Sequence, residues 1–223
     1  MIFRKELREV FAIIDRMLVA LQIGIPTRGT SGVELRRVVG NFQAHQVELV
    51  ENFTIGTELF ACFEQARVAG ATLDTLDAVR NVLVLEQPIF DFGRSAKMTG
   101  MVFSFVEQCK LIAAMTFVSR SAAERMMVRM SKVIEILKLE VAELLDGMDY
   151  QNLTKLAAAL TQHLTVTERK LPQIVRYTMA TSNTALSLSN FLYGDGGRFV
   201  ELIDENGVIN PVFFPRDIQA LSQ

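Results

Sequence analysis

An amphipathic stripe over residues 122–145 constrains the fold of this chain more than any other feature of its sequence. The apolar residues of the stripe repeat at intervals of four, three, four, four and three, the spacing of one face of an α-helix. They are Met126, Met130, Val133, Leu137, Val141 and Leu144. Charged residues fill the opposite face. One side of a helix about 36 Å long must therefore pack against other protein.

A second amphipathic stripe follows Gly147, where the first helix is expected to stop. Its leucines predict a helix over residues 150–167 and are Leu153, Leu156, Leu160 and Leu164. Because only a few residues separate the two helices, we expect them to form an antiparallel helical hairpin.

The chain before these helices also has mostly helical spacing. Residues 2–22 predict one helix, and the glycine-rich segment 24–32 predicts an exposed loop after it. Residues 33–69 repeat the helical spacing, with Gly40 or the segment 54–57 as places where the helix could break or kink. Gly70 marks a stop, and Thr72 or Asp74 can begin the next helix, which reaches Leu85.

Two segments are compatible with more than one kind of structure. Residues 82–85 could instead form a buried strand, and residues 88–93 predict a break. The window 98–118 is apolar enough to suggest a membrane span, but Glu107, Gln108 and Lys110 lie at its centre, where charge is costly in lipid. We therefore predict a helix that is buried in protein, and no membrane span.

The pattern changes at Leu171-Pro172, and three of the five prolines occur from Pro172 onward. Residues 173–179 predict a strand, Asn183 or Thr184 can cap a first helix, and Asp195 is placed to cap a second. Asn206-Gly207 ends that helix, and residues 217–221 predict a returning strand. The sequence thus predicts a mainly α protein with a helical body over residues 1–170 and a small β-α-α-β domain over residues 171–223.

The C-terminal segment resembles a LysM domain. The residues that carry the resemblance are Tyr177-Thr178-Met179, Phe191-Leu192-Tyr193-Gly194-Asp195, Asn206, and the pair Pro211 and Pro215. Two positions depart from the family's pattern. Ser182-Asn183-Thr184 stands where the family has Gly-Asp-Thr, and Arg216 stands where a glycine usually follows the last proline.

A longer stretch, residues 125–223, resembles the C-terminal half of the Mu-like phage DNA circulation proteins. The shared features are the helical hairpin, Arg169-Lys170-Leu171-Pro172, the segment 192–198 and the segment 210–215. Members of that family are tail or baseplate-hub proteins, so the resemblance implies a structural virion protein, made in the bacterial host cytoplasm and assembled into the tail. It also implies partners among other tail or baseplate proteins, and a homo-oligomer.

The LysM resemblance further implies a docking surface at the two turns that close the domain. The candidate residues are Met179, Thr181, Asn183, Asn206, Val208, Phe213, Phe214 and Arg216. Exposed aromatic side chains on a loop mark binding surfaces, although one of Phe213 and Phe214 can instead fill the core of so small a domain. LysM domains elsewhere bind peptidoglycan, which is a weaker alternative here.

The residue inventory favours a binding protein over an enzyme. Cys62, Cys109, His45 and His163 lie far apart in the sequence without ligand clustering, so we expect buried reduced cysteines, partly buried structural histidines and no metal site. No pattern for a cofactor or a nucleophile is present, and no catalytic residue is assigned. The family's name suggests a second function, binding of DNA ends, but a net charge of −2 does not favour it.

Overall fold

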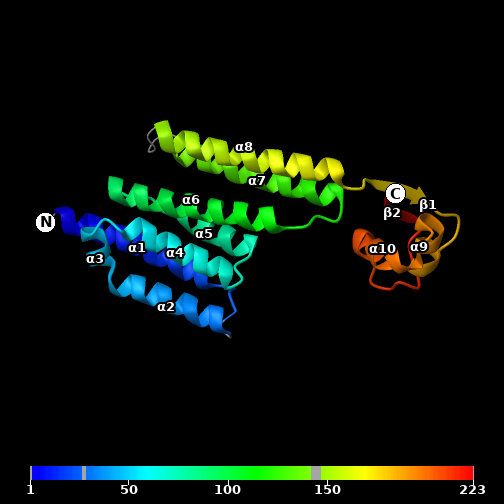
Figure 1. Ribbon diagram of the computed structural model, residues 1–223, viewed down its shortest axis with the longest axis horizontal. Coiled ribbons are helices and arrows are strands. Elements are labelled where there is room, and N and C mark those ends of the chain that lie inside the picture. Colours follow the sequence, from blue (N-terminus) through cyan, green and yellow to red (C-terminus); the bar gives the residue numbers. More distant parts are fainter. Residues whose placement is uncertain (1, 27–28, 142–146, 223) are drawn as a thin grey trace. The chain divides into compact units, whose positions relative to one another are not determined.

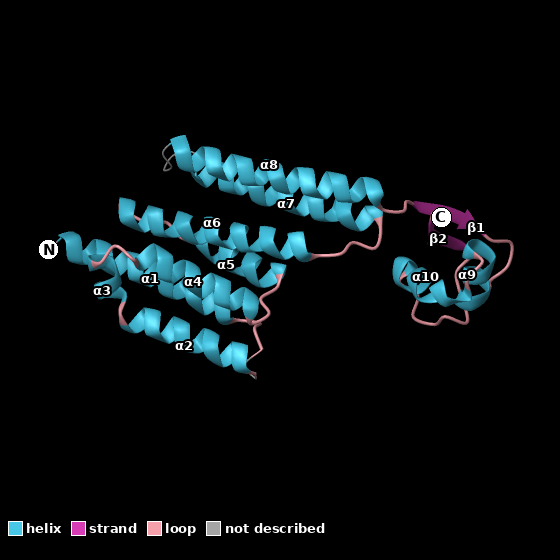
Figure 2. Ribbon diagram, in the orientation of Figure 1, coloured by secondary structure: helices cyan, strands magenta, loops and turns pink. Residues whose placement is uncertain are grey.

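The protein is described by a computed structural model over residues 2–26, 29–141 and 147–222. It is mainly helical, with one small antiparallel sheet near the C-terminus, as Figure 2 shows by colour. The first elements are α1 (Ile2–Gln22), α2 (Thr30–Ala44), α3 (Gln46–Glu51), α4 (Ile55–Val68), α5 (Leu73–Leu85), α6 (Asp91–Ala114), α7 (Arg120–Val141) and α8 (Gly147–Lys170). The remaining elements are β1 (Ile174–Thr178), α9 (Ala185–Tyr193), the 3-10 turn η1 (Gly196–Arg198), α10 (Phe199–Asn206) and β2 (Asp217–Leu221). The predicted mainly α class is confirmed.

The chain forms two compact units. The helical unit comprises Met1–Met115 and Ser131–Leu160, and the C-terminal unit comprises Thr116–Met130 and Thr161–Gln223. The long helices α7 and α8 therefore contribute residues to both units. The predicted division into residues 1–170 and 171–223 stays a prediction.

Helices α1, α5 and α6 make the centre of the helical unit (Figure 1). Each packs against the other two, α4 packs on α6, and α2 packs on α4. Fully buried side chains from the three central helices fill the core: Met17, Leu18, Leu21, Leu76, Leu83, Met101, Phe105 and Ile112. Apart from the adjacent pair Met17 and Leu18, neighbouring members within a helix are three, four or seven residues apart, the spacing by which a helix buries one face.

Gly100 allows α6 to approach its neighbours closely. A Cβ atom at this position would lie 2.7 Å from Cε of Met17 and 2.9 Å from Cδ1 of Leu83. Both of these side chains are completely buried, so neither can move aside without disturbing the core. The glycine in the middle of α6 is therefore a packing residue, which offsets its low helix propensity.

Local signals set the end of α4 and the start of α5. Thr72 is its N-cap, and the Thr72 side chain accepts a hydrogen bond from the backbone N–H of Thr75, 3.2 Å away. Gly70 just before it has a positive φ of 96°, as a helix stop requires. The alternative of a strand over residues 82–85 is wrong, because these residues continue the helix and Leu83 is buried by it. Gly40 likewise leaves α2 unbroken, and the breaks fall at His45 and at residues 52–54.

The start of α6 is capped from a distance. Its N-cap residue, Phe90, has no side-chain oxygen, so the first backbone N–H groups need another partner. The carboxylate of Glu9 in α1 supplies one for the N-cap residue: it accepts hydrogen bonds from the backbone N–H of Phe90 at 3.0 Å and of Ile89, just before the helix, at 2.8 Å. The predicted break at residues 88–93 is thus shorter than expected, and α6 begins at Asp91.

The two cysteines are buried and reduced, as predicted. Burial raises the pKa of Cys62 to about 12 and that of Cys109 also to about 12. Since the thiolate is the reactive form, almost none of it exists at pH 8 in the folded protein. We expect iodoacetamide to add no label to the native chain at pH 8 and two labels after denaturation, measured by intact mass. Rapid labelling of the native chain would contradict this burial.

The last elements form a β-α-α-β arrangement in the predicted order. Strands β1 and β2 pair antiparallel, with Ile174 opposite Leu221 and Thr178 opposite Asp217. Of the two predicted caps of α9, Thr184 is the one used, because its side chain accepts a hydrogen bond from the backbone N–H of Ser187 at 3.2 Å.

Two predictions concern the connection between α7 and α8. Helix α7 begins at Arg120 and is described to Val141, so residues 142–146, which include Leu144, lie outside the described residues. Gly147, expected to stop the first helix, is the first residue of α8. Within the described part of the chain, no helix is both long and apolar enough to cross a membrane.

Candidate functional sites

The C-terminal unit has a core of its own. Its buried residues come from both helices, from β2 and from the loop before β2: Ala185, Leu188, Leu202, Phe214, Ile218 and Ala220. Phe214 is only 1% exposed, so its ring fills the space between the helices and the sheet. Phe214 was a candidate docking residue, and this burial makes it a core residue that a partner cannot touch.

Asn206, another candidate, holds α10 to β2. Its side-chain amide donates hydrogen bonds to the carbonyl oxygens of Leu202 at 2.8 Å and Gln219 at 2.7 Å. Its side-chain oxygen accepts one from the backbone N–H of Gln219 at 2.7 Å. With both polar atoms engaged within the fold, Asn206 supports the surface and does not form part of it.

The turn between α9 and α10 is also built by internal contacts. Asp195 accepts a hydrogen bond from the backbone N–H of Gly197 at 2.7 Å, and the Tyr193 hydroxyl accepts one from the backbone N–H of Leu221 at 2.9 Å. The Arg198 guanidinium lies 4.0 Å from the centre of the Tyr193 ring. Burial raises the pKa of Tyr193, and the hydrogen bond from Leu221 offsets only part of that effect. These residues are therefore structural.

The other predicted docking residues divide between core and surface. Met179 and Val208 are half-buried against the core. Asn183 is half-buried, and its carbonyl oxygen accepts a hydrogen bond from the backbone N–H of Phe214 at 3.0 Å. Thr181, Phe213 and Arg216 are exposed. Thr181, Phe213 and Arg216 are thus the candidates that a partner can reach, and their role in docking stays a prediction, while the remaining candidates mainly support the fold.

Three apolar side chains on one loop are exposed together, and only one of them was a candidate. Ile209 is 100% exposed, Val212 56% and Phe213 72%. We call these three residues the apolar loop. Local hydrogen bonds hold it in place: Pro211 O accepts from Ala185 N at 2.8 Å, and the Asn210 side chain accepts from Val212 N at 3.1 Å. The signal missed in the sequence was an isoleucine that follows the helix-ending Asn206-Gly207 and belongs to neither helix nor strand.

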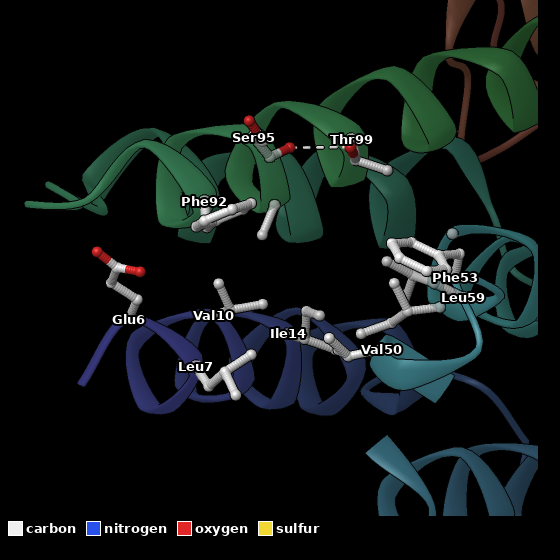
Figure 3. A pocket seen from close by; sticks show the side chains of 13 residues that line it. Glu6, Leu7, Val10, Ile14, Val50, Phe53, Leu59, Phe92, Ser95 and Thr99 are labelled. Carbon is white, nitrogen blue, oxygen red and sulfur yellow. Dashed lines mark hydrogen bonds between the residues drawn. The ribbon is translucent and has the colours of Figure 1, made fainter. Parts of the chain in front are cut away.

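The helical unit has an apolar pocket of about 340 Å³, seen from close by in Figure 3. It lies between α1 and the first turns of α6. Its apolar walls come from four elements and include Leu7, Val10, Ile14, Val50, Leu59 and Phe92. Glu6 lies at one end of the pocket and Phe53 at the other (Figure 3). Nothing in the sequence pattern indicated this pocket, because its walls meet only when the four elements pack.

Phe53 stands at an unusual position of the backbone. Its φ is 57°, in the left-handed region, and it follows the end of α3. The backbone N–H of Phe53 bonds to Val50 O at 3.1 Å and that of Thr54 to Leu49 O at 2.9 Å, which is the helix-ending pattern that favours glycine at this place. Phe53 nevertheless carries an aromatic side chain there, and that side chain is 95% exposed.

A buried polar network joins α4, α5 and α6. Glu107 is 0% exposed and accepts hydrogen bonds from Arg67 Nε and Lys110 Nζ, each at 2.7 Å. Lys110 also donates to Glu64 at 2.8 Å. Burial lowers the pKa of Lys110, but its hydrogen bonds to Glu107 and Glu64 raise it above the ordinary value, and the hydrogen bond from Lys110 lowers the pKa of Glu64.

The second part of the network centres on Arg80, which is 4% exposed. Its guanidinium donates to Gln108 Oε1 at 2.8 Å and pairs with Asp77, and Gln108 Nε2 donates to Asp77 at 2.7 Å. Among the described residues, no buried side-chain nitrogen or oxygen lacks a hydrogen-bond partner. The network therefore holds α4, α5 and α6 together.

The remaining titratable candidates lie at the surface. His45 and His163 are both exposed, which corrects the expectation that they are partly buried. In the portion of the chain that is described, no three His, Cys, Asp or Glu residues are placed to hold a metal ion. No protein-family model matches the sequence, and no curated protein matches it.

Proposed function

We propose that this chain is a structural subunit of a phage tail or baseplate, and that its C-terminal segment is a LysM-like domain that docks on a neighbouring tail protein through the apolar loop. The observation that carries the docking part is the group of exposed apolar side chains Ile209, Val212 and Phe213 on one loop held by hydrogen bonds. A preformed apolar surface loses little conformational entropy on binding. The proposal assigns the chain no catalytic activity.

Several contacts support the LysM-like part of the proposal. The strands are antiparallel and flank two helices, and the residues shared with LysM domains have structural roles here: Tyr193 binds the end of β2, Asp195 caps a turn, and Asn206 joins α10 to β2. Such roles explain why a family would keep these residue types whatever its members bind.

The proposed body includes an antiparallel hairpin of α7 and α8. The contacts that support the hairpin lie where α7 begins and α8 ends. Arg120 begins α7 and its guanidinium Nε lies 2.8 Å from a carboxylate oxygen of Glu168 near the end of α8. The backbone N–H of Arg120 also donates to Pro172 O at 3.1 Å. An antiparallel pair brings the start of one helix to the end of the other.

Serine substitutions at two equally exposed phenylalanines test the docking surface. Phe213 is 72% exposed in the apolar loop, and Phe191 is 73% exposed on α9. We expect Phe213→Ser to lower incorporation of the chain into tails about tenfold or more, because a docked aromatic side chain contributes on the order of 2 kcal/mol. Phe191→Ser should incorporate as the unchanged protein does. The measurement is quantitative mass spectrometry of purified particles.

Circular dichroism of both variants should match that of the unchanged protein, because each substitution removes an exposed side chain. Equal incorporation of both variants would remove the apolar loop from the docking surface. Absence of the unchanged chain from particles would overturn the structural role itself.

A further inference from the structure

The pocket between α1 and α6 has the size and lining of a binding site for apolar side chains. A dry cavity of about 150 Å³ suffices to bind benzene, and binding pockets start near 300 Å³. This pocket measures about 340 Å³, so it can hold one aromatic ring with room for a second, smaller apolar group. Val10 and Leu59 on its floor are buried, whereas Phe53 and Phe92 at its edge are exposed.

The position of Phe53 indicates that this end of the pocket binds a partner, because the exposed ring contributes little to the stability of the fold. A phenylalanine in the left-handed position at the end of α3 is less stable than a glycine there. A buried ring could offset that loss through packing, but this ring is 95% exposed. An aromatic side chain is thus exposed to solvent at a backbone position that favours glycine.

The charges beside the pocket point to a basic partner. Between Arg37 and Arg67 the sequence has no lysine or arginine, and the exposed acids Glu48, Glu51 and Glu58 lie on α3 and α4, within five residues of Phe53 in the sequence. At the opposite end of the pocket, Glu6 is the charged residue of the lining (Figure 3). The stretch of α3 and α4 that lines the Phe53 end of the pocket is therefore acidic and has no lysine or arginine.

Basic residues are present near the pocket but do not line it. Arg4, Lys5 and Arg8 are exposed on α1, and Arg94 on α6 pairs with Asp91 at 3.3 Å. The lining itself has one charge, that of Glu6, and it is negative. The Glu6 end of the pocket therefore has charges of both signs around it, and only the α3–α4 side is uniformly acidic.

We propose that this pocket is a docking site for a protein segment that inserts one or two bulky apolar side chains and carries lysine or arginine beside them, on the side formed by α3 and α4. The apolar side chains bind between α1 and α6 against Val10, Leu59 and Phe92. The cations of the segment lie near Glu51 and Glu58. This site is separate from the apolar loop and does not depend on it.

Three synthetic peptides of equal length test the chemistry of the occupant. The first has a phenylalanine and a leucine flanked by lysines, the second replaces the lysines by glutamates, and the third replaces the two apolar residues by alanines. Binding of each labelled peptide to the full chain is measured by fluorescence anisotropy. The second peptide lacks the attraction between lysine and the carboxylates, and the third lacks the burial of apolar side chains. We therefore expect the first to bind about tenfold or more tighter than either of the others.

A glycine in the lining allows the pocket to be filled without harm to the fold. Gly56 lies in the first turn of α4, and a Cβ atom there would meet nothing within 4 Å. We expect Gly56→Leu to weaken the lysine peptide about tenfold or more, since its side chain occupies the apolar space. Gly40→Leu is the matched control, because Gly40 is also helical and also has open space around it. Both variants should keep the melting temperature of the unchanged protein or exceed it.

Two further variants separate the contributions of the edge. Phe53→Gly removes the exposed ring from a backbone position that suits glycine, so we expect weaker peptide binding with an unchanged or higher melting temperature. Glu51→Lys combined with Glu58→Lys should weaken the lysine peptide about fivefold and reduce its dependence on salt.

Three outcomes would overturn the proposal. The first is equal binding of the lysine and glutamate peptides, and the second is unchanged binding of the lysine peptide to Gly56→Leu. The third is self-association of the unchanged chain in analytical ultracentrifugation that Gly56→Leu abolishes, since the occupant would then be a second copy of this chain.

Discussion

Replacing Asp77 by alanine should destabilise the helical unit by about 3 kcal/mol, because removing one partner of a buried ion pair leaves the other poorly compensated. Arg80 is 4% exposed, and both its own guanidinium and the Gln108 amide donate to the Asp77 carboxylate. Loss of this acceptor affects two buried donors at once. The melting temperature should fall by about 6–12 °C in a protein of this length.

An exposed pair of the same spacing serves as the control. Asp91 and Arg94 are also three residues apart on a helix, but their side chains are 89% and 50% exposed. Asp91→Ala should cost less than about 1 kcal/mol, since water replaces the lost interaction. Urea denaturation followed by circular dichroism measures both variants. If the two substitutions cost the same, burial of the Arg80 network has no energetic role.

Replacing Phe214 by alanine should unfold the small β-α-α-β segment and leave the helical unit folded. Removing a fully buried phenylalanine costs about 3–5 kcal/mol, and a core this small rarely supplies more than that. Phe214 is 1% exposed among six core residues, so few others can compensate. Amide hydrogen exchange should show loss of protection in β1, α9, α10 and β2, with protection retained in α1, α5 and α6.

Phe213 is the neighbouring control for this experiment. It has the same side chain one residue earlier but is 72% exposed. Phe213→Ala should change stability by less than about 0.5 kcal/mol, as is usual for exposed positions. Preserved protection of β2 in Phe214→Ala would contradict the assignment of this ring to the core.

This pair of phenylalanines also shows where prediction from sequence stops. The sequence indicated that one of the two rings could fill the core, and alternation along the chain puts them on opposite sides. Which ring points inward depends on where Asn183 and Ser182 hold the loop, through hydrogen bonds to the backbone of Phe214 at 3.0 and 2.7 Å. Those contacts join residues about thirty positions apart, so no local pattern contains them.

The sequence by itself determined the elements whose causes are local. Helical periodicity predicted α1, α7 and α8, and the capping residues Thr72 and Thr184 marked where α5 and α9 begin. Asp195, predicted to cap the second helix of the C-terminal segment, instead caps the 3-10 turn η1 that precedes α10. Such signals act over three or four residues, within the reach of one turn of helix. The order β-α-α-β at the C-terminus was predictable for the same reason.

Tertiary structure alone decided the features that need distant partners. Glu9 caps α6 from α1, Gly100 is set by the side chains of Met17 and Leu83, and Glu107 is neutralised by Arg67 from another helix. The pocket beside Phe53 and the exposure of Ile209 belong to this group as well. Each depends on which helix faces come together, and that choice follows from the packing of the whole core and not from any single segment.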